Sequence, residues 1–140
     1  MLSHDDLSAV SEAIALAEAG TSGEIRVHLE PRLPAGDALT RSRQVFTELG
    51  MHRTRERNAV LIYVALDDHQ LAVLGDEGVH AHVGDGYWDR IRDLLVERLR
   101  AGRPRQALVE AVAEVGRTLQ AHFPRRPDDT NELSDQVSAP

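Results

Sequence analysis

The fold is decided by one uninterrupted apolar run, Ala59-Val60-Leu61-Ile62-Tyr63-Val64-Ala65-Leu66. An apolar stretch of this length without polar alternation is typical of a central strand that is covered on both faces. Three polar residues, Asp67-Asp68-His69, separate this run from a second strand pattern over residues 70–75. Because three residues are enough for a hairpin loop and too few for a crossover, we expect these two strands to be antiparallel.

Upstream of the run, polar and apolar residues alternate from Glu24 to Glu30, which predicts a strand with one buried face. A helical pattern over residues 39–49 lies between this strand and the run. The strand-helix-strand order makes the two strands parallel and joins them by a right-handed crossover. The sequence therefore predicts a small mixed sheet of three strands.

Three further helices are indicated. The first follows a capping pattern at Ser3 and Asp6 and ends near Ala19, the second carries Trp88, and the last begins at Pro104. Residues 79–83 fit either a short helix or a strand. At 140 residues we expect one domain, over residues 1–124, followed by a polar tail over 125–140 that is mobile or strapped loosely to the surface.

The composition excludes several kinds of chemistry. The chain has no lysine and no cysteine, which rules out a lysine Schiff base, a thiol nucleophile, a disulfide and a cysteine zinc site. A net charge of −7 opposes binding to nucleic acid and favours cationic partners, metals included. No apolar run is long enough for membrane insertion, and the first residues do not resemble a signal peptide, so we expect a cytoplasmic protein.

The predicted strand order brings polar residues from three segments to one end of the sheet. The first two strands start at this end and the third returns to it, so Glu24, the loop 53–58 and the turn 75–78 share one edge. Carboxylate oxygens suit Ca²⁺ or Mg²⁺, and arginine forks suit phosphate or carboxylate groups. The alternative is a solvated edge with arginine–glutamate pairs. The candidate metal ligands are Asp76, Glu77, Glu24, Asp85 and Asp89, and the candidate anion-binding residues are Arg55, Arg57 and Asn58.

The order of several short motifs resembles the TPM domain, a family named partly for a thylakoid-lumen phosphatase-like protein. The motifs are Thr21-Ser22-Gly23-Glu24-Ile25, Leu49-Gly50-Met51, Arg57-Asn58-Ala59-Val60, Gly75-Asp76-Glu77-Gly78-Val79 and Gly84-Asp85-Gly86-Tyr87-Trp88-Asp89. The resemblance implies a three-layer α/β/α sandwich with helices on both faces of a small mixed sheet. It also implies divalent-cation binding in some members and acid phosphatase activity in a plant branch. This chain has Gly75-Asp76-Glu77-Gly78-Val79 where many exported members have Gly-Tyr-Gly-Leu-Glu.

Two functional hypotheses follow. The first is a small binding or accessory domain, stabilised by Ca²⁺ or Mg²⁺, that acts on a protein partner near a membrane. The second is a metal-dependent, acid phosphatase-like hydrolase of phosphomonoesters, without an organic cofactor. In the second, Asp76, Glu77 and Glu24 would bind the cation, Arg57 or Arg55 would hold the phosphate, and Asp85 or Asp89 would orient water.

Overall fold

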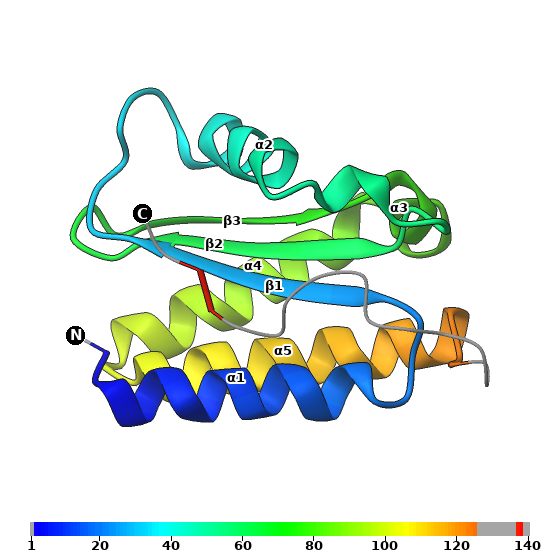
Figure 1. Ribbon diagram of the computed structural model, residues 1–140. Coiled ribbons are helices and arrows are strands. Elements are labelled where there is room, and N and C mark those ends of the chain that lie inside the picture. The colour runs from blue at the N-terminus through cyan, green and yellow to red at the C-terminus, as the bar shows by residue number, and fades with distance from the viewer. Residues whose placement is uncertain (1, 126–136, 139–140) are drawn as a thin grey trace.

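The computed structural model describes residues 2–125 and 137–138 (Figure 1). Most of the predicted tail therefore lies outside the described residues. The elements in chain order are α1 (His4–Glu18), β1 (Glu24–Glu30), α2 (Ala38–Glu48), the 3-10 turn η1 (Met51–Arg53), β2 (Ala59–Ala65), β3 (Gln70–Gly75), α3 (Glu77–Val83), α4 (Asp85–Arg100) and α5 (Pro104–His122). Residues 79–83, compatible with helix or strand in the sequence, are helical.

The sheet has the predicted topology, in the order β1-β2-β3. β1 runs parallel to β2, with Glu24 opposite Ala59, and β3 runs antiparallel to β2, with Gly75 opposite Val60. Every residue of β2 is buried, as the apolar run predicts.

Helices cover both faces of the sheet, which gives the three-layer α/β/α sandwich (Figure 1). On one face, α1, α4 and α5 enclose a large apolar core that includes Val60, Ile62 and Val64 of β2. On the other face, α2 covers a smaller core that includes Leu61 and Tyr63. No helix in the described part of the chain is long and apolar enough to cross a membrane.

α1 and α5 lie side by side beneath the sheet (Figure 1). A Cβ atom built on Gly116 of α5 would lie 2.6 Å from the Cβ of Ala17 in α1, so only glycine permits this close approach. The Thr21 hydroxyl donates hydrogen bonds to the carbonyls of Leu119 (3.1 Å) and Phe123 (2.5 Å), which fixes the end of α5 beside the start of β1.

Local sequence signals explain where the helices begin and end. The Ser3 hydroxyl accepts from the Asp6 amide, and the Asp6 carboxylate accepts from the Ser3 amide, so the predicted capping box is confirmed. Asp37 caps α2 by accepting from the Thr40 amide at 2.7 Å. Gly50 follows α2 in the left-handed conformation (φ 69°), which turns the chain toward β2.

Candidate functional site

Polar residues gather at the end of the sheet where β1 and β2 begin and β3 ends, as the strand order predicts. Glu24 lies opposite Ala59 in the β1–β2 register, and the Asp76 amide donates to the Ala59 carbonyl at 2.9 Å. Glu24 and Asp76 therefore lie at the same end of the sheet, on either side of the start of β2. The polar residues predicted to share this edge come from three different loops.

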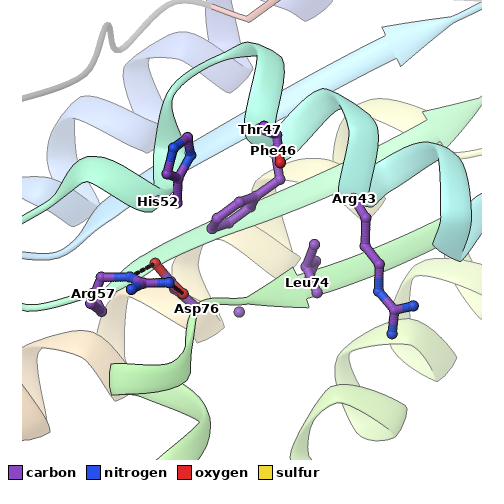
Figure 2. A pocket seen from close by; sticks show the side chains of 8 residues that line it. Arg43, Phe46, Thr47, His52, Arg57, Leu74 and Asp76 are labelled. Atoms are coloured by element: carbon purple, nitrogen blue, oxygen red, sulfur yellow. Dashed lines mark hydrogen bonds and ion pairs between the residues drawn. The ribbon is translucent and has the colours of Figure 1, made fainter.

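A pocket of about 270 Å³ opens at this end, between α2 and the end of β3. Arg43 and Arg57 stand at opposite ends of it, with Phe46 and Leu74 between them (Figure 2). Its remaining lining residues are Thr47, His52, Gly75 and Asp76. The pocket thus combines an apolar floor with two guanidinium groups, a hydroxyl and an imidazole.

Asp76 and Arg57 form a bidentate ion pair at one end of the pocket (Figure 2). Arg57 Nε donates to Asp76 Oδ2 at 2.8 Å and Nη2 donates to Oδ1 at 3.0 Å. Asp76 is also the N-cap of α3, where Oδ1 accepts from the Glu77 amide at 2.8 Å. The hydrogen bonds to Asp76 raise the pKa of Arg57, so the guanidinium stays charged at any pH the fold survives.

The backbone of Arg57 is unusual as well. Its φ of 52° lies in the left-handed region, which costs a residue with a side chain about 1 kcal/mol or more. The surrounding structure holds this conformation, because the Arg57 amide donates to the Thr54 carbonyl and the Gly78 amide donates to the Arg57 carbonyl at 2.9 Å. His69, in the hairpin at the opposite end of the sheet, has a similar φ of 53°, so the left-handed backbone alone does not distinguish the two ends.

The predicted metal ligands are only partly brought together. Arg57 Nη1 lies 3.3 Å from Glu77 Oε1, so one guanidinium links the Asp76 and Glu77 carboxylates. Glu24 is fully buried at the start of β1, whereas Asp89 is exposed on α4. Asp85, almost fully exposed, lies 3.3 Å from His80 Nε2. Within residues 2–125 and 137–138, no three histidine, aspartate or glutamate side chains are grouped so that they could hold a metal ion.

The predicted anion-binding residues also differ in their environment. Arg57 lines the pocket, whereas Arg55 is exposed and does not line it. Asn58 is buried, and its amide donates to Ser22 Oγ (3.2 Å) and Glu56 Oε2 (3.1 Å). Asn58 therefore serves to join the loop before β2 to the start of β1.

Sequence reasoning did not find the α2 side of the pocket. Arg43 and Thr47 are four residues apart on α2 and share one face of the helix, which is the signal that could have indicated them. His52, in η1, has a buried Nδ1 with no hydrogen-bond partner among the described residues. Arg43 forms no close ion pair within the part of the chain that the structure describes, but its charge acts on Asp37 and helps to lower the pKa of that carboxyl.

Comparison with known proteins gives the family. Residues 1–118 match the family model described as the TPM domain. The chain belongs to the TPM domain family. A similar solved structure is that of the BA42 protein from the psychrophilic bacterium Bizionia argentinensis, with 37% sequence identity and a TM-score of 0.91. The alignment covers 100% of this TPM domain chain and 96% of BA42.

Two more distant structures share the fold. The N-terminal domain of the cg2496 protein from Corynebacterium glutamicum has 17% identity and a TM-score of 0.68, over 85% of this chain and 74% of that one. The N-terminal domain of a protein from P. gingivalis has 19% identity and a TM-score of 0.73, over 89% and 82%. No curated protein matches this TPM domain.

The opposite end of the sheet holds a second polar cluster of this TPM domain, centred on Glu30. The Glu30 carboxylate is buried and accepts hydrogen bonds from Arg41, from the Tyr63 hydroxyl (2.5 Å) and from His28 Nε2 (3.2 Å). The hydrogen bonds from Arg41 are the main reason why the pKa of Glu30 falls to about 2. Burial and the Glu30 carboxylate raise the pKa of Tyr63, so its hydroxyl remains a donor.

Proposed function

We propose that this TPM domain is a binding domain, and that its pocket between Arg43 and Arg57 takes an anionic group, a carboxylate or a phosphate. The observation that carries the proposal is the lining of the pocket, to which Arg43, Thr47 and His52 contribute beside the Arg57–Asp76 pair. Guanidinium forks and hydroxyl groups are the donors that planar or tetrahedral oxyanions need.

The charges in the pocket favour an anion at the Arg43 end. At the Arg57 end, the Asp76 carboxylate already compensates the guanidinium. Arg43 forms no close ion pair within residues 2–125 and 137–138, and its charge acts only at longer range on Asp37, which does not line the pocket. Phe46 and Leu74 lie between the two ends, so an anionic group on an apolar body fits better than a small inorganic ion. In the accessory role expected from the sequence, that group belongs to a side chain of a protein partner.

Binding is favoured over hydrolysis because of the state of Asp76. Asp76 is the single carboxylate residue among the described residues that line the pocket. Both of its oxygens already accept hydrogen bonds, from Arg57 and from the Glu77 amide. A general base must hold a lone pair toward the water it activates, so hydrolysis would first require Asp76 to lose Arg57. A phosphomonoester hydrolase is therefore the alternative function.

The proposal is tested by NMR titration of the full chain with phenyl phosphate, which joins an oxyanion to an apolar ring. Arg43→Gln removes the uncompensated charge, and Arg57→Gln leaves Asp76 as an unmatched negative charge in the pocket. We expect each variant to bind at least fivefold more weakly than the wild type. Arg92→Gln, on the exposed side of α4 at the other face of the sheet, is the matched control.

Two results would reject the proposal. One is an equal loss of binding in Arg92→Gln, which would mean that binding depends only on the net charge of the protein. The other is release of phenol at a rate that Asp76→Asn abolishes, which would favour the hydrolase. Release of phenol is measured in the same samples, with and without Mg²⁺.

We further propose divalent-cation binding at Asp76 and Glu77, for Ca²⁺ or Mg²⁺. The supporting observation is that the Arg57 guanidinium already lies between these two carboxylates, where a bound cation would compete with it. The fit is incomplete, because no third aspartate, glutamate or histidine among the described residues joins these two carboxylates to form a cation site. The cation would have to displace Arg57 and take further oxygens from water.

A further inference from the structure

The outer edge of β1 is occupied by residues from the far end of the same chain. β1 is an edge strand of the sheet, and Val137–Ser138 lie along it (Figure 1). The Ser138 amide donates to the Val27 carbonyl at 2.9 Å, and the Leu29 amide donates to the Ser138 carbonyl at 3.0 Å. These bonds form a parallel bridge between Ser138 and His28, so the segment pairs with β1 as an added strand would.

Side chains of the added segment occupy two neighbouring subsites. The Ser138 hydroxyl lies 2.9 Å from His28 Nδ1. Val137 packs against the large apolar core and lines a recess of about 450 Å³ along α1. The other lining residues of this recess are His4, Leu7, Ser8, Ser11 and Glu12. The edge therefore accepts an apolar side chain followed by a hydroxyl side chain, one on each side of the added strand.

Contacts within the fold hold the outer edge of β1 in place. His28 is buried, its Nε2 lies 3.2 Å from Glu30 Oε1, and its ring stacks on Tyr63 with a centroid distance of 6.0 Å. Toward the start of β1, the Ile25 amide is bonded to Glu18 Oε2 at 2.6 Å. The accepting edge is therefore limited to residues 27–29, and it needs little rearrangement to receive an extended segment.

We propose that residues 27–29 of β1 form a strand-addition site for an extended segment of a protein partner, and that Val137–Ser138 occupy it in competition. The partner segment runs parallel to β1 and carries an apolar residue followed by serine or threonine. Its chemistry is inferred from the segment seated there, which supplies two backbone hydrogen bonds, one hydroxyl and one valine side chain. Backbone pairing gives affinity in such sites, and the side-chain subsites give specificity.

This site is separate from the pocket between Arg43 and Arg57, since none of the residues that line that pocket belongs to β1. The proposal does not depend on the anion-binding function. Because the competing segment is tethered to the site, it acts at a high effective concentration, and a partner gains access when the segment is displaced. Val137 and Ser138 therefore determine how tightly a partner segment must bind in order to displace them.

The test uses the full chain and the variant Ser138→Pro, which removes both the amide donor to Val27 and the hydroxyl beside His28. The probe is a fluorescent peptide with the sequence of residues 133–140, measured by polarisation. We expect the peptide to bind Ser138→Pro at least tenfold more tightly than it binds the wild type. A peptide with threonine at the serine position should bind as well, and a peptide with the valine changed to aspartate should not bind.

Hydrogen exchange at the Leu29 amide gives an independent measurement. The amide should exchange slowly in the wild type, faster in Ser138→Pro, and slowly again when the peptide is added. Equal peptide affinity for both proteins, or slow exchange in Ser138→Pro without peptide, would overturn the proposal. Concentration-dependent dimerisation of the wild type through exchanged C-terminal segments would also overturn it, because a second copy would then be the occupant.

Discussion

The Arg57 guanidinium donates two parallel hydrogen bonds, of 2.8 and 3.0 Å, to the Asp76 carboxylate at the end of β3. The Asp76 side chain is almost completely buried, whereas Arg57 is 42% exposed. An arginine that is partly in solvent can leave this pair more easily than the carboxylate can. Arg57 is therefore the group whose removal should change what the polar end of the sheet binds.

The first prediction concerns divalent cations. Arg57→Met should strengthen Ca²⁺ binding, because it removes the cation that competes for Asp76 and Glu77. Asp76→Asn combined with Glu77→Gln should weaken Ca²⁺ binding and abolish any rise in melting temperature on adding Ca²⁺, since a ligand stabilises only the state that binds it. Calorimetric titration and thermal unfolding measure both effects.

The control for this prediction is Asp67→Asn combined with Asp68→Asn, in the hairpin at the other end of the sheet. The Asp68 carboxylate accepts from the Leu33 amide at 2.7 Å, so this variant can lower stability without changing cation binding. Loss of Ca²⁺ binding in the control, with binding intact in the Asp76 and Glu77 variant, would contradict the prediction and place the cation site at the hairpin end of the sheet.

The second prediction concerns acid stability. The pKa of Glu30 is lowered from 4.5 to about 2 in the folded protein, mainly by hydrogen bonds from Arg41. The folded state therefore binds this proton more weakly than the unfolded state. The resulting stabilisation is complete above pH 4.5 and is lost as the pH falls toward 2, and it amounts to about 3 kcal/mol. Urea unfolding between pH 7 and pH 2 measures it.

Arg41→Met is the variant that isolates this effect. Removing one partner of a buried ion pair should cost about 3–5 kcal/mol at pH 7. It should also flatten the acid profile, because the pKa of Glu30 returns toward its ordinary value. Arg98→Met, which breaks the more exposed pair with Glu110, should cost about 1 kcal/mol or less. Equal acid profiles for the wild type and Arg41→Met would contradict the assignment.

The third prediction concerns the centre of the sheet. Ile62→Ala should lower the free energy of unfolding by about 2–5 kcal/mol, through lost burial and the cavity that remains, because Ile62 is fully buried in β2. Leu16→Ala is the control, since Leu16 is 77% exposed and its removal should change stability by about 0.5 kcal/mol or less. An unchanged melting temperature for Ile62→Ala would mean that β2 is not central.

The fourth prediction concerns the end of β3. A Cβ atom on Gly75 would lie 2.1 Å from two ring atoms of Trp88, so Gly75→Ala should displace the indole and destabilise the protein. Trp88 is the only tryptophan, and its indole donates to His80 Nδ1 at 2.9 Å, so the change should shift the intrinsic fluorescence. Gly86→Ala, where a Cβ meets nothing within 4 Å, should leave both stability and fluorescence nearly unchanged.

Much of the fold could be predicted from the sequence because its signals are local. The apolar run at β2, the three-residue hairpin and the helix before β2 determine strand order and direction, and all were confirmed. The short segment 79–83 was ambiguous because five residues give too few periods to distinguish helix from strand. Asp76 as the N-cap of α3 is the signal that decides it in the structure.

The sites were less predictable, because they depend on which distant side chains meet. The sequence placed Arg57 and Asp76 at one edge, but it gave no sign of their bidentate pairing or of the left-handed backbone at Arg57. The sequence did not show that α2 lines the pocket, because this depends on how α2 packs over β3. The Glu30 cluster depends on Arg41 of α2 reaching Glu30 on the face of the sheet that α2 covers, and on the hydroxyl of Tyr63 in an otherwise apolar strand.

The contact between α1 and α5 has a consequence for how the chain is made. The stripe on α1 that carries Val10, Ile14 and Ala17 packs against a helix that begins at Pro104. During vectorial synthesis the first helix leaves the ribosome long before its partner exists. The ribosome must add about a hundred residues before this stripe can be covered, at about 5–20 residues per second. The apolar side chains of this stripe therefore stay uncovered by α5 for about 5–20 s, and a chaperone that binds exposed apolar side chains should associate with the nascent chain until α5 emerges.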